Sequence, residues 1–414
     1  MDLFNYKNET LFCEELSVPQ IAEKIGTPFY LYSKNTLLRH YRHLEESLAD
    51  IDHLICYAMK ANSSLGICRL LAECGSGADI VSGGELYRAL LSGIPANKIV
   101  FNGNGKTPEE LKYALDSDIL MFNVDSDEEL ILLNKLAAEM GCKARVALRV
   151  NPDIDPHTHP YISTGLKENK FGIAIEHAVE FYKEADALPH IDIVGVHKHI
   201  GSQIVELSPF VESLERIMSL VSGLEQLGIN IRYIDMGGGI GITYRDEEPP
   251  SFEDYVGAVR PLINSGRTLI VEPGRVILGN AGILVAKVLG VKKSGSKNFV
   301  VVDAAMNDLI RPSLYGAYHR IIPVERRQNG TPTVTADVVG GICESTDFFA
   351  RGRELPLLEP GELIAIMSAG AYCSSMSSNY NSRPLIAEVM VDKSDIKIIR
   401  RRQTFEEMVS LESF

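Results

Sequence analysis

The sequence has few cysteines, and their spacing follows no framework. There are seven, an odd number, and no two of them show the Cys-x-x-Cys spacing of zinc knuckles and redox motifs. This pattern argues against a disulfide scaffold, because such scaffolds pair an even set of cysteines. We therefore expect reduced thiols and a cytoplasmic location.

Long apolar runs and an excess of positive charge are also missing. No stretch of about 18 apolar residues occurs, so we expect no membrane span. Residues 1–15 are polar and acidic, without a basic region followed by an apolar one, and no signal peptide is expected. The 41 Lys and Arg residues are outnumbered by 55 Asp and Glu residues, which gives a net charge of -14. This balance argues against a nucleic-acid partner, which needs a basic footprint.

What the sequence does contain is a repeated alternation of apolar and amphipathic segments. Between residues 54 and 275, short apolar runs are followed by turns and helical periodicity, which predicts parallel βα units. Strands are expected at 54–59, 78–81, 98–101, 119–124, 144–150, 191–196, 231–234 and 269–271. Helices are expected at 84–91, 108–115, 126–140, 175–182, 209–227 and 252–263. Eight units in about 220 residues favour an α/β fold of the (β/α)8 TIM-type barrel over an open sheet.

The pattern changes after residue 275. Apolar runs continue without regular helices between them, at 283–291, 299–302, 333–339, 363–367 and 387–391. A further strand-like run at 29–32 precedes the barrel, and chain termini often lie close together. We therefore expect two domains. They are a barrel over 34–275 and a β-rich domain built from 1–33 and 276–414.

Candidate functional residues follow the apolar runs, because barrels of this type place their active sites where the strands end. Lys60 ends the first run, where loss of water lowers a lysine pKa and frees the amine for Schiff-base chemistry. The alternative is a solvated lysine. The glycines 237–239 follow the seventh run and favour a phosphate site, although a tight turn has the same composition. Ile242 stands where a dinucleotide fingerprint needs glycine, so that motif is excluded.

Two histidines and a carboxylate complete the candidate constellation. His197 and His199 are two apart where the expected sixth strand ends, so in an extended strand they would point the same way and suit a metal ion. The cationic groups of Lys60 and Arg275 argue against a divalent cation, and we expect no metal. A lysine, a phosphate cradle and the carboxylate of Glu272 instead match the needs of pyridoxal phosphate. The loop 151–170, with two further histidines, is a candidate lid.

Several motifs resemble one family. YAMKAN at 57–62, HIGSQ at 199–203, GGG at 237–239 and EPGR at 272–275 resemble the alanine-racemase-fold decarboxylases that use pyridoxal 5'-phosphate. The motifs at 306–315, 343–347 and 370–372 favour the branch that acts on diaminopimelate. The resemblance extends from about residue 29 to residue 387. It implies decarboxylation of meso-2,6-diaminopimelate to L-lysine and CO2, the last step of lysine biosynthesis.

The resemblance also implies roles for individual residues. Lys60 would carry the cofactor, His199 would stack on its ring, and Glu272 would pair with the ring nitrogen. The other implied cofactor contacts are Asp79, Ser202, Gly238, Gly239, Gly274, Arg275 and Tyr372. The implied substrate contacts are Arg275, Arg311, Tyr315, Glu344 and Tyr372. Cys343 is the implied proton donor, and because its motif reaches the site from a neighbouring subunit in this family, a homodimer with shared active sites is expected.

Other interpretations stay open at the level of sequence. The chain could act on another basic amino acid or a carboxylated polyamine, or it could be a racemase on the same fold. A non-catalytic pyridoxal-phosphate-binding protein is a further alternative, as is an unrelated barrel enzyme, since fold alone does not fix function. Arg311 and Tyr315 would then form a packed surface turn, and Cys343 would be an ordinary buried thiol.

Overall fold

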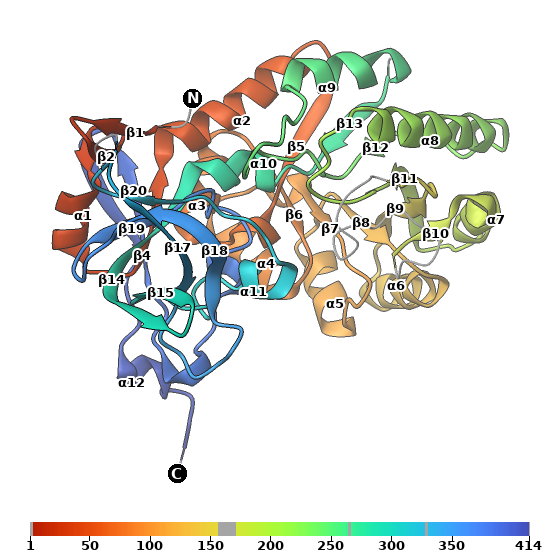
Figure 1. Ribbon diagram of the computed structural model, residues 1–414. Helices are drawn as coiled ribbons and strands as arrows, with labels where there is room; N and C mark the ends of the chain where they lie inside the picture. Colours follow the sequence, from red (N-terminus) through yellow and green to blue (C-terminus); the bar gives the residue numbers. More distant parts are fainter. Residues whose placement is uncertain (1–2, 156–170, 264–265, 328–329, 414) are drawn as a thin grey trace. The chain divides into compact units, whose positions relative to one another are not determined.

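The computed structural model describes residues 3–155, 171–263, 266–327 and 330–413 (Figure 1). Two compact units are present. One, the barrel unit, contains Arg42–Ile242 and Glu248–Gly274, and the other, the β-rich unit, contains Met1–Tyr41, Thr243–Glu247 and Arg275–Phe414. Most of the candidate lid at 151–170 lies outside the described residues.

The barrel unit is a closed ring of eight parallel strands. The strands are β5 (His53–Ala58), β6 (Gly77–Ile80), β7 (Ile99–Phe101), β8 (Met121–Val124), β9 (Ala144–Asn151), β11 (Ile191–His197), β12 (Tyr233–Asp235) and β13 (Thr268–Val271). Each pairs in parallel with its neighbours, and the pairs β13–β5 and β8–β9 close the ring. The two-residue strand β10 (Ile173–Ala174) adds to β9. The predicted barrel is therefore confirmed, with a strand at each of the eight predicted places.

Helices surround the ring (Figure 1). They are α2 (Lys34–Leu48), α3 (Leu65–Glu73), α4 (Gly83–Leu91), α5 (Pro108–Asp116), α6 (Asp127–Met140), α7 (Ile175–Asp186), α8 (Ser208–Gln226) and α9 (Phe252–Val259). Four of them begin where a Ser or Thr side chain accepts a backbone N–H of the first turn, which satisfies a donor that the helix leaves unpaired. These caps are Ser82, Thr107, Ser126 and Ser251. Sequence periodicity missed α3, whose preceding Ser64 makes no such cap.

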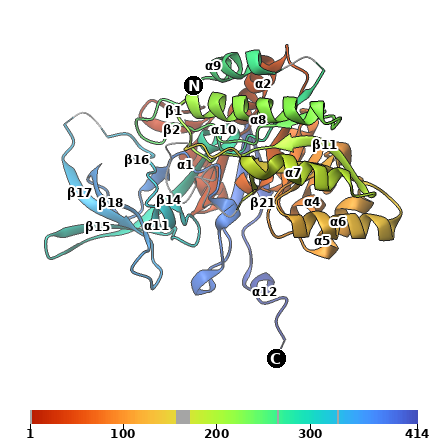
Figure 2. The same ribbon diagram turned by 90° about the vertical axis from the view of Figure 1, so that its right-hand side faces the viewer.

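The β-rich unit is built on a nine-stranded sheet that includes a strand from the N-terminal segment. Its strands are β4 (Phe29–Ser33), β14 (Gly282–Ser294), β15 (Lys297–Val302), β16 (Ile321–Pro323), β17 (Thr333–Val339), β18 (Phe348–Pro356), β19 (Leu363–Ile366), β20 (Ala387–Asp392) and β21 (Asp395–Arg400). β4 lies between β14, to which it is antiparallel, and β20, to which it is parallel. The predicted entry of the N-terminal segment into this unit is therefore confirmed. Figure 2 shows β15, β17 and β18 side by side.

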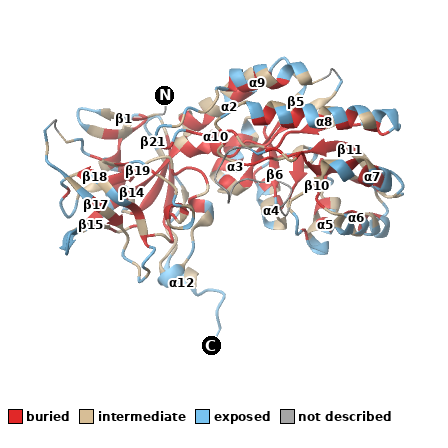
Figure 3. Cartoon of the chain, turned by 45° about the vertical axis from the view of Figure 1, so that its right-hand side comes forward, coloured by how far each residue is buried: buried red, intermediate tan, exposed pale blue. Residues whose placement is uncertain are grey.

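Smaller elements complete this unit. They are β1 (Phe4–Lys7), β2 (Thr10–Cys13), β3 (Leu16–Ser17), α1 (Val18–Ile25), α10 (Arg275–Leu278), α11 (Arg311–Tyr315) and α12 (Phe405–Met408). All five residues of β4 are buried, and Phe29 and Leu31 pack with Ile283, Val285 and Val389 in one core. In Figure 3 the strands are mostly buried and the outer helix faces exposed. Among the described residues, no helix is long and apolar enough to span a bilayer.

Two lysines of the barrel unit have fully buried side chains in different electrostatic surroundings. Lys198 follows β11, and its Nζ donates to Ser213 Oγ on α8 at 2.8 Å. No carboxylate forms an ion pair with it in the described part of the chain, and burial lowers the pKa of Lys198 to about 7. Lys106 instead has its Nζ 2.6 Å from Glu129 Oε1, and it donates to two backbone carbonyls. One lysine is therefore buried without an ion pair in the described part of the chain, and the other is paired.

Lys198→Met is expected to stabilise the protein, whereas Lys106→Met is expected to destabilise it. In the unfolded chain Lys198 has a pKa near 10.5 and keeps its proton, whereas folding lowers this pKa to about 7. The buried lysine therefore destabilises the folded protein fully below pH ~7, and this loss of stability fades toward pH ~10. At pH 7 we expect Lys198→Met to raise the free energy of unfolding by on the order of 2–4 kcal/mol, a figure that already subtracts the lost hydrogen bond to Ser213. Lys106→Met leaves Glu129 buried and unpaired, at a cost of roughly 3–5 kcal/mol.

Chemical denaturation of both variants at pH 7 and pH 9 measures these differences. The advantage of Lys198→Met should shrink at the higher pH, because the parent then loses less by deprotonating the amine. A destabilised Lys198→Met protein at pH 7 would contradict the account of an uncompensated buried lysine.

Candidate active site

Lys60 lies at the end of a barrel strand, beside a buried carboxylate. It belongs to a 3-10 turn, Met59–Ala61, directly after β5, and its Nζ is 3.2 Å from Asp79 Oδ2 on β6. Burial, and then the charge of Glu272, raises the pKa of Asp79 to about 7. The Lys60 side chain keeps 37% of its exposure, so it is less desolvated than the sequence suggested. An amine that is partly exposed at a strand end is accessible to an incoming carbonyl compound.

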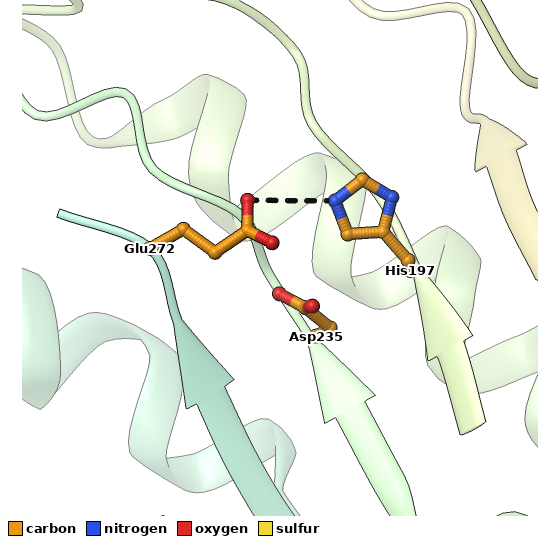
Figure 4. Close-up of side chains that lie close together, drawn as sticks. All are labelled: His197, Asp235 and Glu272. Atoms are coloured by element: carbon orange, nitrogen blue, oxygen red, sulfur yellow. Dashed lines mark ion pairs between the residues drawn. The ribbon is translucent and has the colours of Figure 1, made fainter. Parts of the chain in front are cut away.

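Glu272 follows β13 and is held inside the ring by two neighbours. Asn102 Nδ2 donates to Glu272 Oε1 at 2.5 Å and to Asp79 Oδ1 at 2.7 Å, so it joins the two carboxylates. On the other side, His197 Nε2 is 3.6 Å from Glu272 Oε2 (Figure 4). Burial opposes its charge, but His197 and Lys60 hold the pKa of Glu272 below its usual range. Glu272 is therefore a fixed, buried anion.

Asp235, at the end of β12, is the third member of this group. Asn123 Nδ2 donates to Asp235 Oδ2 at 3.1 Å, and the Gly237 N–H donates to Oδ1 at 2.9 Å. Burial, and then the charge of Glu272, raises the pKa of Asp235 well above its usual range. Of the two neighbouring carboxyls, Glu272 thus keeps the negative charge.

His197, Asp235 and Glu272 have ligand atoms within 4.8 Å of one another, a spacing that a metal ion could use (Figure 4). The sequence had paired His197 with His199 for that role. β11 ends at His197, so the expectation that both histidines lie on one strand is wrong. The expected absence of a metal stays a prediction.

The glycines after β12 form a tight cradle. Gly237 and Gly239 have φ angles of +65° and +129°, which side-chain-bearing residues rarely adopt. A Cβ on Gly238 would lie 2.3 Å from the Glu272 carbonyl oxygen, so only glycine fits. The Gly238 N–H donates to His199 Nδ1 at 3.3 Å, and burial lowers the pKa of His199 well below its usual range. A neutral His199 therefore lies against the backbone of this cradle.

Three polar residues of the ring were missed by sequence reasoning. Asn102, Asn123 and Arg149 are all buried at or near strand ends. Asn123 donates to Asn102 Oδ1 at 2.9 Å, which orients the Asn102 amide toward the carboxylates. The Arg149 guanidinium lies 4.5 Å from the centre of the Phe171 ring. The sequence feature that could have identified these three residues is a polar residue inside or directly after an apolar run.

A second group of predicted residues lies in the β-rich unit. Arg275 and Arg311 begin α10 and α11, and both are buried. Both guanidinium groups donate to the hydroxyl of Tyr244, a residue that the sequence did not single out. The Arg275 guanidinium also lies 4.7 Å from the centre of the Tyr372 ring. Arg311 is thus no surface residue. Two of the predicted residues, Arg275 and Arg311, meet at one phenol, and Tyr372 lies against Arg275.

The remaining predicted residues, apart from Gly274, are more exposed. Cys343 is an exposed free thiol, so its interpretation as an ordinary buried cysteine is wrong. Glu344 Oε1 accepts hydrogen bonds from the Thr346 N–H and hydroxyl, both at 3.1 Å. Tyr315 ends α11 and is half-buried, as is Ser202 in the loop after β11. Gly274 is buried and is the last residue of the barrel unit.

Comparison with known proteins places this arrangement in a family. The sequence model of the family "Pyridoxal-dependent decarboxylase, pyridoxal binding domain" matches residues 34–279 of this chain. The diaminopimelate decarboxylase of Vibrio cholerae is 49% identical over 416 residues, which cover 100% of this chain and 99% of that protein. The corresponding enzyme of Helicobacter pylori, crystallised with L-lysine, is 44% identical with a TM-score of 0.91, covering 95% of this chain and 98% of that one.

A third relative agrees along the whole chain. Diaminopimelate decarboxylase from M. jannaschii, in co-complex with L-lysine, is 41% identical with a TM-score of 0.94 and covers 100% of this chain and 98% of that one. The likeness includes both the barrel unit and the β-rich unit. The chain therefore belongs to the diaminopimelate decarboxylase family of pyridoxal-dependent decarboxylases.

Proposed function

We propose that this protein decarboxylates meso-2,6-diaminopimelate to L-lysine and CO2 with pyridoxal 5'-phosphate as cofactor. The observation that carries the proposal is the match, over the entire chain, to relatives named for that reaction. Two of these relatives were crystallised with L-lysine, the product expected here. The buried arginines of the β-rich unit add support, because a substrate with two amino-acid ends offers carboxylates to bind.

The residues of the barrel unit fit the cofactor. The Gly238 position leaves no room for a side chain, as expected where a backbone approaches a phosphate closely. Glu272 is a buried anion, the partner that a protonated ring nitrogen needs. When bound, pyridoxal phosphate supplies an electron sink for the bond that breaks. Lys60 would hold the cofactor, and His199 would pack against its ring.

The other cofactor contacts follow from the family resemblance. We assign Asp79 and Ser202 to supporting roles around Lys60 and the phosphate. Gly238, Gly239, the backbone of Gly274 and Arg275, and the Tyr372 hydroxyl hold the phosphate. Because Asn102 donates to both Asp79 and Glu272, it fixes two of these groups relative to each other.

Substrate binding and proton delivery fall to the β-rich unit. Arg275 and Arg311 bind carboxylate, with Tyr315 and Tyr372 as further contacts, and Glu344 meets the distal ammonium. Cys343 donates a proton to the carbon that loses CO2. Its exposure in the single chain is compatible with service in a neighbouring subunit, so we propose a homodimer with shared active sites.

The proposal extends to the division of labour along the chain and to location. Residues 34–275 form the cofactor-binding domain, and 1–33 with 276–414 contribute substrate and dimer contacts. All seven cysteines are free thiols, which supports a cytoplasmic location.

Release of CO2 from three amino acids tests the substrate. The purified holoprotein is expected to release CO2 from meso-diaminopimelate and to leave ornithine and arginine nearly untouched, because these lack the second carboxylate. Faster release from ornithine or arginine would move the protein to a related decarboxylase. Cofactor binding without any turnover would support a non-catalytic carrier.

Lys60→Ala is expected to abolish CO2 release, because the substitution removes the amine that we propose carries the cofactor. Borohydride reduction of the unmodified holoprotein should fix the cofactor to the peptide that contains Lys60, as peptide mass spectrometry would reveal. Lys112→Ala is the matched control, since Lys112 lies on the exterior helix α5 in an exposed ion pair. Label on a peptide without Lys60 would contradict the assignment.

Mixing two impaired variants tests the shared site. Lys60→Ala and Cys343→Ala homodimers are each expected to lose most activity, but a random mixture should regain about a quarter of it, since half the dimers hold one intact site. Lys60→Ala mixed with Glu272→Ala is the control and should regain none, because both changes fall in the barrel unit. No recovery in the first mixture would contradict a site shared between subunits.

A further inference from the structure

Tyr244 joins two buried arginines of the β-rich unit. Its hydroxyl oxygen accepts from Arg275 Nη1 at 2.6 Å and from Arg311 Nη1 at 2.9 Å. All three side chains are at least nine-tenths buried. A guanidinium group can only donate hydrogen bonds, so the phenol oxygen must be the acceptor in both contacts. Both lone pairs of the hydroxyl oxygen are therefore engaged.

The hydrogen of the Tyr244 hydroxyl is the remaining site of that hydroxyl group, and Arg311 Nε is a second buried donor without a hydrogen-bond partner among the described residues. A hydroxyl offers one donor and two acceptor sites, and the acceptor sites are occupied. No protein acceptor for this hydrogen occurs among the residues that the structure describes. The backbone N–H of Tyr244 donates to Glu247 Oε2 at 2.9 Å, so the segment itself is anchored. A buried donor beside two cations thus has no acceptor in the part of the chain that the structure describes.

His319 holds Arg311 without neutralising it. Arg311 Nη1 donates to His319 Nε2 at 3.0 Å, while His319 Nδ1 is 2.9 Å from the Met367 carbonyl oxygen. Because a carbonyl only accepts, Nδ1 carries the proton and Nε2 offers its lone pair. Burial, aided by the charge of Arg311, lowers the pKa of His319 to about 3, so the ring stays neutral. The ring also packs edge-on against Tyr244, with 5.4 Å between centroids.

We propose that the Tyr244 hydroxyl donates a hydrogen bond to the substrate carboxylate that Arg275 and Arg311 bind. This inference rests on the proposed function. Two guanidinium groups and a phenol O–H provide three donor groups to one anion, and hydrogen bonds to a charged acceptor are the stronger ones. A neutral end group would leave the phenol donor and the guanidinium groups poorly satisfied, which disfavours its binding. Tyr244 is therefore a residue that determines specificity.

The carboxylate in question is the one that the product keeps. Cations that hold a carboxylate stabilise its negative charge and so oppose its loss as neutral CO2. The arginine pair is thus suited to the carboxylate that does not react. After decarboxylation that group becomes the α-carboxylate of L-lysine, so product and substrate share the contact with Tyr244.

Binding of L-lysine and cadaverine separates this role from a general structural one. Cadaverine has the same carbon chain and both amines but lacks the carboxylate. In Tyr244→Phe holoprotein, calorimetry should show L-lysine affinity reduced by about 10- to 100-fold, with cadaverine affinity unchanged. The KM for meso-diaminopimelate should rise by a similar factor, with a smaller change in kcat.

Tyr318→Phe is the matched control. Tyr318 is in the same unit, and its ring lies over the guanidinium groups of Arg245 and Arg353, outside the group assigned to the substrate. Both ligands should bind this variant as they bind the unmodified protein. Tyr244→Leu serves as a second variant. If one of the two Tyr244 variants folds poorly, the same binding measurements on the other one test the inference.

Equal loss of affinity for both ligands, or no loss for either, would overturn the inference. Failure of the proposed function looks different, because the unmodified protein would then release no CO2 from meso-diaminopimelate. An active unmodified protein whose Tyr244→Phe variant keeps its preference for L-lysine over cadaverine contradicts the role of Tyr244 alone.

Discussion

The contact between Asn102 and Glu272 is the constraint on which the barrel interior depends. Glu272 is buried within a ring of parallel strands, where an isolated charge is costly. The Asn102 amide, held by Asn123, and the imidazole of His197 make that charge tolerable. The neighbouring carboxyl of Asp235 accommodates it by a raised pKa. One ionised group is thereby selected from several that the sequence places at the same edge of the sheet.

The β-rich unit buries charges of the opposite sign, those of two arginines. Arg275 and Arg311 cannot lose their charge by giving up a proton, so their burial needs acceptors. Tyr244 and a neutral His319 provide acceptors without a counter-charge. Neither of these acceptors carries a negative charge, whereas a carboxylate in the same place would have neutralised the guanidinium groups. The polar interiors of both units are arranged so that full charges are kept and not cancelled.

Periodicity was a good guide to the framework and a poor guide to its polar interior. Each of the eight barrel strands is an apolar run bounded by turns, a pattern that depends on local sequence. The strand β18 contains three arginine or glutamate residues, and β21 alternates charged with apolar residues, so neither stands out as an apolar run. Lys60, Glu272 and the glycines were found through motif position. Asn102 and Tyr244 were not, because their roles arise from partners far away in the sequence.

The central place of β4 has a consequence for how the chain folds during synthesis. The last barrel strand ends at Val271, but β4, made from residues 29–33, must wait for β14 and then for β20, which ends at Asp392. Contacts across such sequence distances are slow to form, because loop closure precedes any gain. Even after β14 has paired with it, this buried apolar strand keeps one open edge until β20 is made, and open strand edges are the kind of surface that chaperones protect.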